Sequence, residues 1–176
     1  MPDRSKASAI PAPKTEIITI VGKSDSGKTT LLEKLVAELT RRGYRIGTVK
    51  HAHDGFDMDR EGKDSWRHKK AGAHTVLVIA DDRIALIRDD RTGDLEKMRT
   101  YLFDVDIILA EGFKGQPLPK IEIFRTAGGH KAPLCMKDNS LIAFVTDSSH
   151  KPDVPVFGLE EVGRLADFIE KNHLRK

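Results

Sequence analysis

The sequence predicts an α/β protein in which a mostly parallel sheet carries helices on both faces, in three layers, with an added β-hairpin. The first observation is a β-branched run at residues 16–21, which is followed by a glycine-rich loop and then by apolar residues at helical spacing. The second is the recurrence of short apolar runs that end in polar residues, as buried parallel strands do. The third is a pair of apolar runs, 75–80 and 83–88, around a short acidic turn, which is the pattern of a hairpin.

The glycine-rich loop reads G-x-x-x-x-G-K-T, the phosphate-binding pattern of P-loop NTPases. Its two glycines allow the backbone to wrap a phosphate, and the helix that follows directs free N–H groups at the anion. Lys28 supplies positive charge for the β- and γ-phosphates, and the Thr29 hydroxyl is a ligand for Mg²⁺. We therefore predict a three-layer P-loop NTPase fold. The expected nucleotide-binding residues are Gly22, Lys23, Ser24, Asp25, Ser26, Gly27, Lys28, Thr29 and Thr30.

Composition limits the classes of partner. The chain has 176 residues and a formal net charge of +3, and with 6% aromatic residues we expect no nucleic-acid partner. Cys135 is the sole cysteine, so a cysteine zinc cluster is excluded. Residues 1–14 hold three prolines and predict a disordered leader, with one nucleotide-binding domain over 15–176. No apolar run approaches about 18 residues and no signal core is present, so we expect a cytoplasmic protein without a membrane segment.

A polar segment, residues 51–65, follows the second predicted strand, residues 45–50, at the edge of the sheet where open α/β folds bind ligands. Two interpretations remain open: a site for Mg²⁺, water or a second phosphorylated ligand, and a solvent-exposed loop rich in turn formers. In the first, Asp57 or Asp59 positions water or metal and is catalytic together with Lys28. Two further residues of the segment are candidate transition-metal ligands, although no third ligand is evident: His51 and His53.

Short helices are expected on either side of the hairpin. Asp64 is the predicted cap of a helix over residues 65–72, and residues 94–102 form a second capped helix. The hairpin leaves an exposed edge, and such an edge can pair with another subunit.

A third strand carries the expected metal ligand. Residues 106–112 form an apolar run that ends in an acid and a glycine, as a Walker B strand does. A carboxylate at the tip of that strand holds Mg²⁺ or its water opposite the phosphate loop. We therefore predict that Glu111 binds the metal with Thr29, the alternative being a strand-end residue that faces solvent.

Cations gather after this strand in the sequence. Lys114, Lys120 and Arg125 either bind a second anionic ligand or balance the charges of Glu111 and Glu122, and the sequence favours neither. The last predicted elements are strands at 120–125, 141–147 and 154–158 and an amphipathic helix at 159–173.

Asp147 ends one of these strands. GTPases carry a Thr/Asn-Lys-x-Asp motif at such a strand end, and its aspartate accepts hydrogen bonds from guanine. Here Asp147 directly follows Thr146 and the lysine is missing, so it is either a base-reading residue or a turn residue.

With these motifs in place, the sequence resembles the molybdopterin-guanine dinucleotide biosynthesis protein B family. The phosphate loop is shared by many NTPases, whereas the combination of Lys63-Asp64-Ser65, Ala71-Gly72-Ala73 and Glu111-Gly112-Phe113-Lys114 is more specific. Further markers of the resemblance are Lys50-His51, Phe56-Asp57-Met58-Asp59, Gly62 and Pro119-Lys120-Ile121-Glu122.

The resemblance implies a homodimeric GTP-binding protein with weak, Mg²⁺-dependent GTPase activity. It implies a role in assisting the enzyme that joins GMP to molybdopterin, so GTP, molybdopterin or the molybdenum cofactor, and that enzyme are the expected partners. In some NTPases of this class a second lysine of the loop reaches the partner subunit's nucleotide, and Lys23 occupies that position. Residues 51–65, with Lys114 and Lys120, are expected to face the pterin phosphate or the partner enzyme.

Two other functions remain open. In a small-molecule kinase, Asp57 or Asp59 accepts a hydroxyl proton from a pterin-like or other acceptor. In a nucleotide-gated scaffold, the nucleotide binds without turnover. Neither a catalytic glutamine nor an arginine finger is identifiable, which predicts slow hydrolysis, because such a group accelerates it by about 10³-fold or more.

Overall fold

The computed structural model places most of the chain in two compact units. One unit comprises the described residues up to 51 and from 98 onward, and the other lies between 52 and 97. The range that we predicted as one nucleotide-binding domain therefore contains two units, and the predicted leader, 1–14, lies outside the described residues. The structure describes residues 15–52, 55–56, 58–90 and 95–174.

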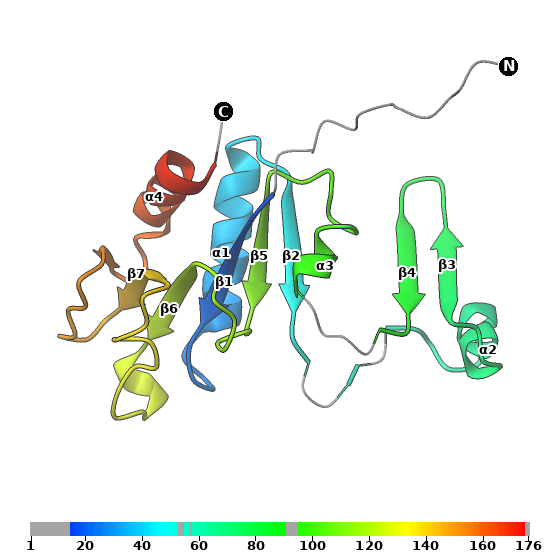
Figure 1. The fold of residues 1–176 in the computed structure, drawn as a ribbon, viewed down its shortest axis with the longest axis horizontal. Coiled ribbons are helices and arrows are strands. Elements are labelled where there is room, and N and C mark those ends of the chain that lie inside the picture. The colour runs from blue at the N-terminus through cyan, green and yellow to red at the C-terminus, as the bar shows by residue number, and fades with distance from the viewer. Residues whose placement is uncertain (1–14, 53–54, 57, 91–94, 175–176) are drawn as a thin grey trace, which may run out of the picture. The chain divides into compact units, whose positions relative to one another are not determined.

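The first unit is built on a six-stranded sheet in the order β2-β5-β1-β6-β7-β8, in which every pairing is parallel (Figure 1). β1, β5 and β6 lie at its centre and are buried along almost their whole length, as the short apolar runs predict. The strands are β1 Glu16–Val21, β2 Ile46–Lys50, β5 Ile107–Glu111, β6 Lys120–Phe124, β7 Leu141–Thr146 and β8 Val156–Phe157.

Two long helices cover one face of this sheet. α1 (Lys28–Arg41) and α4 (Val162–His173) share a single hydrophobic cluster with the inward side chains of the strands. We predicted helices on both faces of the sheet, and α1 and α4 lie on the same face. On the other face Leu102 and Val105 approach Gly47 of β2, and Cys135 packs with Val21. The main cluster contains Ile18, Ile20, Leu31, Leu35, Leu39, Ile107, Leu109, Ile121, Val145, Leu165 and Ile169.

The second unit contains the predicted hairpin, β3 (Thr75–Ile79) and β4 (Ile84–Arg88), and the helix α2 (Asp64–Lys70). Asp64 was predicted as the cap of this helix, but it is the first helical residue. Lys63 occupies the cap position, and its side chain forms no capping hydrogen bond.

Two elements differ from the prediction in length. The helix predicted over 94–102 is reduced to α3 (Leu95–Met98), which is followed by turns. A short 3-10 helix, η1 (Thr126–Gly128), was not predicted. None of the helices in the described ranges has the length and apolar character needed to cross a lipid bilayer.

Candidate functional site

The loop between β1 and α1 adopts a conformation that requires glycine. Gly22 has φ 155° and Gly27 has φ 91°, and Asp25 between them also lies at positive φ, 58°. A Cβ on Gly22 would lie 2.5 Å from the Ser26 hydroxyl oxygen and 2.6 Å from the Ile123 carbonyl oxygen, too close for real atoms. The sequence therefore folds as the phosphate-binding pattern predicts, with the backbone turned tightly before the helix begins.

Polar groups of the loop point inward. The Lys28 ammonium group folds back and donates a hydrogen bond of 2.7 Å to the Lys23 carbonyl. The Ser26 side chain is buried, and its hydroxyl oxygen has no hydrogen-bond partner within the part of the chain that the structure describes. A buried hydroxyl without a partner is costly, and the first N–H groups of a helix also lack intrahelical partners. The loop is therefore a cluster of donors suited to an anion.

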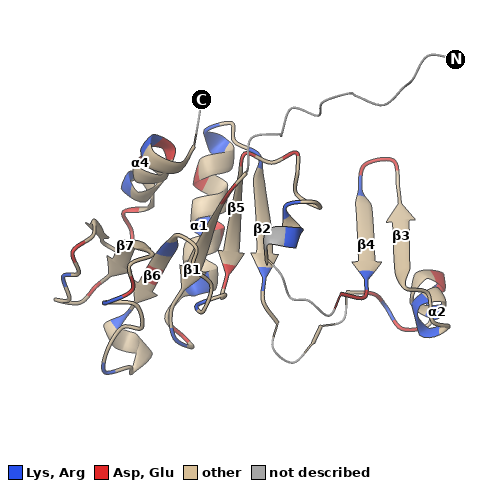
Figure 2. Cartoon of the chain, in the orientation of Figure 1, with Lys and Arg blue, Asp and Glu red and all other residues tan. Residues whose placement is uncertain are grey.

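The predicted metal ligands meet at the start of α1. The Thr29 hydroxyl donates to the Glu111 carboxylate, with oxygen–oxygen distances of 3.2 and 3.3 Å. β5 lies beside β1, and Glu111 pairs with Ile20, so the acidic tip of β5 reaches the loop that follows β1 (Figure 2). The structure thus brings together two residues that are 82 positions apart in the sequence.

The turn after Glu111 is also constrained. Gly112 and Phe113 both have positive φ, 99° and 55°, and a Cβ on Gly112 would lie 3.3 Å from the Cβ of His51. The His51 ring packs edge-on against the Phe113 ring, with centroids 5.0 Å apart. His53, the other candidate metal ligand, lies outside the described residues, and the described residues contain no group of three metal-ligating side chains.

The catalytic roles of the two aspartates stay predictions. Asp57 lies outside the described residues, and Asp59 belongs to the second unit. Asp147, the candidate base reader, directly follows β7 and accepts a hydrogen bond of 2.8 Å from the Thr126 amide. That amide lowers the pKa of the Asp147 carboxyl below its usual value. The base-reading role of Asp147 stays a prediction.

Lys120 is not where we expected it. It was one of the lysines expected to face an anionic ligand, yet its side chain is only 2% exposed. Its ammonium group donates to the Gln116 carbonyl at 2.6 Å and to the Ser140 hydroxyl at 2.5 Å, and it lies 3.2 Å from the Asp138 carboxylate. With its donors used in this way, Lys120 holds the chain together and is unavailable to a ligand.

Glu122, two residues further along β6, has a similar structural role. Its buried carboxylate accepts hydrogen bonds from the amides of Leu134 and Cys135, at 2.5 and 2.8 Å. Burial raises the pKa of this carboxyl, and the two amide donors act in the opposite direction. Lys120 and Glu122 together anchor an irregular segment, residues 129–140.

That segment contacts the phosphate-binding loop through a residue that sequence reasoning missed. The His130 ring nitrogen Nε2 lies 2.8 Å from the Ser24 carbonyl oxygen. A carbonyl can only accept a hydrogen bond, so Nε2 carries the proton in this contact. No periodic pattern marks residues 129–140, and the one available signal was a lysine and a glutamate inside a strand that is otherwise apolar.

Two shallow hollows adjoin the loop and share Gly27 and Thr30. One, of about 270 Å³, is formed by residues of the loop itself. The other, of about 160 Å³, extends along α1 toward the chain that follows β8. It is lined by Leu31, Lys34, Ile123, Arg125, Leu159 and Glu160 in addition to the shared residues. The loop is thus bordered by one hollow with polar walls and by a second with apolar and charged walls.

Comparison with known proteins gives a consistent result. The sequence model of the family described as "Molybdopterin guanine dinucleotide synthesis protein B" matches residues 17–147. A molybdopterin-guanine dinucleotide biosynthesis adapter protein of Haemophilus influenzae is 38% identical over 157 residues, which are 88% of this chain and 87% of that protein. The Escherichia coli protein of the same name is 37% identical over 158 residues, 87% of this chain and 90% of that protein. The crystal structure of Bacillus subtilis MobB aligns with a TM-score of 0.72 at 26% identity, covering 91% of this chain and 98% of that one.

Proposed function

Because this chain belongs to the molybdopterin guanine dinucleotide synthesis protein B family, we propose that it is a GTP-binding adapter with weak GTPase activity. In this proposal it assists the enzyme that joins GMP to molybdopterin. The names of its relatives support the adapter role, since they are adapter proteins of molybdopterin-guanine dinucleotide biosynthesis. The nucleotide is the part of the proposal that depends on the geometry of this chain.

The observation that carries the proposal is the hydrogen bond from Thr29 to Glu111 beside the glycine loop. The main-chain amides at the start of α1 would bind the β-phosphate, and Lys28 would leave the Lys23 carbonyl for the γ-phosphate. The cleft toward Lys34 and Glu160 would hold the nucleoside. In this proposal the loop, Lys28 and the cleft would bind successive parts of one nucleoside triphosphate.

Magnesium fits the donor set at this point. A hydroxyl and a carboxylate are the oxygen ligands that Mg²⁺ prefers, and it commonly takes only one or two protein ligands, with water and phosphate oxygens completing the shell. Thr29 and Glu111 would hold it. When bound, the ion neutralises negative charge on the β- and γ-phosphates.

Slow hydrolysis is part of the proposal. The phosphate loop, the acidic tip of β5 and the turn after it hold no glutamine in the role that orients the attacking water in fast GTPases. Such a group accelerates hydrolysis by about 10³-fold or more, so we expect slow turnover without one. GTP would act mainly as a bound ligand that is cleaved occasionally.

We include a homodimer in the proposal because of the hairpin. Leu77 pairs with Leu86 and Ile79 with Ile84, so these four side chains share one face, and each is 43–68% exposed. Figure 2 shows both strands uncharged along most of their length, with acidic residues at the turn. An apolar face of this kind is a surface on which a second copy can pack.

Sedimentation velocity of the full chain tests the proposed homodimer. The wild type should sediment as a dimer, and a variant with Ile84→Asp and Leu86→Asp should be monomeric. A monomeric wild type would refute the dimer.

Calorimetric titration tests the nucleotide. Wild type should bind GTP in the presence of Mg²⁺ more tightly than ATP, and Lys28→Ala should lose most of the GTP affinity. Lys131→Ala, which removes an exposed lysine outside the loop, is the matched control. GTP affinity that is equal in Lys28→Ala and wild type would refute the site. Release of labelled phosphate supports hydrolysis, whereas its transfer to a pterin would indicate the alternative, a kinase.

A further inference from the structure

Arg125 lies beside the phosphate-binding loop, and the proposed function leaves it without a role. It is the first residue after β6, and β6 pairs with β1, so it lies at the edge of the sheet where the loop begins. A Cβ on Gly27 would lie 3.2 Å from Arg125 Cδ and 3.6 Å from its Nη1. The stem of Arg125 therefore packs on the loop backbone, at a position where glycine leaves room for it.

The guanidinium group of Arg125 is half-buried and has no partner in the described part of the chain. No hydrogen bond or ion pair joins it to another described residue, and its Nε is inaccessible to solvent. Because Nε is buried, a ligand can contact only the outer end of the group. Keeping a cation partly out of water without an acid beside it is costly, so this outer end calls for a ligand.

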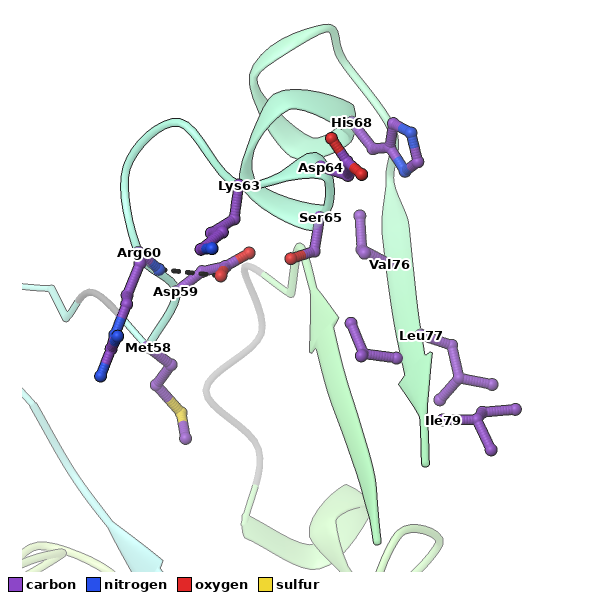
Figure 3. Close-up of a pocket in the computed structure, with 11 residues that line it drawn as sticks. Met58, Asp59, Arg60, Lys63, Asp64, Ser65, His68, Val76, Leu77 and Ile79 are labelled. Carbon is purple, nitrogen blue, oxygen red and sulfur yellow. Dashed lines mark hydrogen bonds between the residues drawn. The ribbon is translucent and has the colours of Figure 1, made fainter. Parts of the chain in front are cut away.

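A larger hollow in the second unit has a different character. Its volume is about 660 Å³, and it lies between residues 58–68 and β3 (Figure 3). Its Asp59 carboxylate is closed to a ligand, because Oδ1 accepts a hydrogen bond from the Arg60 amide and Oδ2 is inaccessible to solvent. Its basic side chains, Arg60 and Lys63, are exposed, so water can solvate them. The half-buried Arg125 has less access to water, which makes it the stronger candidate for a ligand contact.

Arg125 and Asp147 lie at the same edge of the sheet. β6 and β7 pair with Phe124 opposite Thr146, so Arg125 and Asp147 follow the two strands at neighbouring positions (Figure 1). The Thr126 amide chiefly lowers the pKa of the Asp147 carboxyl, and the charge of Arg125 adds to this effect, so the two side chains are within electrostatic reach. The lysine of the guanine motif is missing after β7, and Arg125 supplies a cation next to the candidate base reader.

Arg125 lies on the side of the loop away from the predicted metal ligands. β1 has β5 on one side and β6 on the other, so Glu111 at the tip of β5 and Arg125 after β6 flank the loop from opposite sides. The proposed function places Mg²⁺ and the γ-phosphate near Glu111. Arg125 is therefore placed for the nucleoside end of the ligand.

The hollow that Arg125 lines suits a flat ring. It has a volume of about 160 Å³, and its apolar walls are Leu31, Ile123 and Leu159. Lys34 also lines it, but its ammonium group pairs with Glu160 at 2.6 Å, whereas Arg125 forms no ion pair with a described residue. A guanidinium group is planar and stacks on aromatic faces, which an ammonium group cannot do in the same way.

We propose that Arg125 stacks its guanidinium group on the purine base of the bound nucleotide and so holds the base in this hollow. The inference rests on the proposed function for the nucleotide, and it adds the residue that positions the base. The stack supplies affinity for either purine, because every base has a flat π-face. The choice between guanine and adenine then falls to groups at the edge of the base, with Asp147 as the predicted reader.

Calorimetric titration of the full-length chain with GTP, ATP and inorganic tripolyphosphate, each with Mg²⁺, tests this role. Arg125→Lys keeps the charge and loses the plane, so its affinity for GTP and for ATP should each fall by about tenfold. Tripolyphosphate has no base and reports on the loop alone, so Arg125→Lys should bind it as wild type does. Arg45→Lys alters an exposed arginine just before β2, at the opposite edge of the sheet, and this matched control should bind all three ligands normally.

Arg125→Met separates stacking from charge. It should bind GTP no more tightly than Arg125→Lys does, while its affinity for tripolyphosphate stays close to that of wild type. If Arg125→Met loses as much affinity for tripolyphosphate as for GTP, Arg125 is a phosphate ligand and the stack is overturned. An equal loss for all three ligands in Arg125→Lys would show a disturbed loop and would also overturn it.

The results distinguish this role from the proposed function. A fall in ATP affinity in Arg125→Lys would support the stack even if wild type preferred ATP, a preference that would refute the choice of GTP. Nucleotide affinity that is lost in Lys28→Ala but unchanged in Arg125→Lys would leave the nucleotide site in place and overturn the role of Arg125 alone.

Discussion

His130 donates a hydrogen bond of 2.8 Å from Nε2 to the Ser24 carbonyl, which joins the segment after β6 to the phosphate-binding loop. The segment itself is held by Glu122, which accepts from the Leu134 and Cys135 amides. Gly128 lies against the same part of the loop, and a Cβ there would be 3.6 Å from the Asp25 carbonyl. The outer side of the loop is therefore supported by chain that contains no part of the phosphate-binding motif.

His130→Ala should weaken GTP binding modestly while leaving the protein folded. A neutral hydrogen bond contributes about 0.5–1.5 kcal/mol, so the affinity should fall by about two- to tenfold. Calorimetric titration with GTP measures this, with His68→Ala in the second unit as the control. Affinity that is equal in His130→Ala and wild type would show that the contact does not shape the loop.

Glu122→Gln should destabilise the fold more than it changes binding. A glutamine presents one oxygen, so one of the two amides now bound by the carboxylate loses its acceptor in a buried place. The loss of unfolding free energy should be about 1–3 kcal/mol, measured by urea denaturation at pH 7. Glu160→Gln, at an exposed carboxylate, should change stability far less. A stability unchanged in Glu122→Gln would contradict the anchoring role.

Gly22→Ala should both unfold the loop and abolish nucleotide binding. The new Cβ would collide with the Ser26 hydroxyl and with the Ile123 backbone, which cannot move aside without disturbing β6. We expect a loss of about 3 kcal/mol in stability and no measurable GTP binding. Gly43→Ala separates steric contact from backbone strain. Gly43 also has positive φ, 93°, but nothing lies within 4 Å of the Cβ that alanine would add there.

The Gly43→Ala variant should lose only about 1 kcal/mol, from backbone strain alone, and should bind GTP normally. Thermal unfolding measures the loss of stability in Gly22→Ala and Gly43→Ala, and titration with GTP measures their nucleotide affinity. If the two proteins lose the same stability, steric contact at Gly22 is not what fixes glycine there.

Thr29→Val and Glu111→Gln should remove the advantage that Mg²⁺ gives to GTP binding. The first removes a proposed oxygen ligand and the second replaces a charged carboxylate by a neutral amide, so affinity in Mg²⁺ should fall by about tenfold while affinity in its absence stays close to that of wild type. Thr40→Val, at an exposed threonine on the same helix, is the control. An undiminished effect of Mg²⁺ in both variants would remove these residues from the metal site.

The phosphate loop and its carboxylate were predictable because both lie on regular elements. The motif fixes where α1 begins, and an acid at the end of a buried strand reaches the same edge of a parallel sheet, so Thr29 and Glu111 meet as expected. Lys120 and Glu122 were read as charges near the site, since a sequence does not show which side of a strand is covered. Their partners lie in irregular chain without periodicity: Gln116 before β6 for Lys120, and Cys135 after β6 for Glu122.

The separate packing of residues 52–97 was not predicted for a related reason. The hairpin was predicted correctly from its two apolar runs, β3 and β4, but both were expected to add to the main sheet. The hydrophobic pattern of a strand shows which of its residues face a core. It does not show which other strand it pairs with when a long polar segment connects them.

Stability should decline in acid partly through Glu38, on α1. Hydrogen bonds from Arg41 and Arg42 lower the pKa of the Glu38 carboxyl from its ordinary 4.5 to about 2. Because the folded protein binds this proton less readily than the unfolded chain, the contribution is fully present above pH 4.5 and is lost as the pH falls toward 2. Arg42 extends the same network to Asp167 and Glu170 of α4, so protonation also weakens the link between the two long helices.

Glu38→Gln should therefore flatten the loss of stability with falling pH. Urea denaturation at pH values from 5 down to about 2.5 should show a smaller decline in unfolding free energy for the variant than for wild type. Glu33→Gln, an exposed position on the same helix with no ion pair among the described residues, should keep the wild-type decline. If Glu38→Gln and wild type lose stability in parallel, the carboxylate's partners do not favour its charged form in the folded protein.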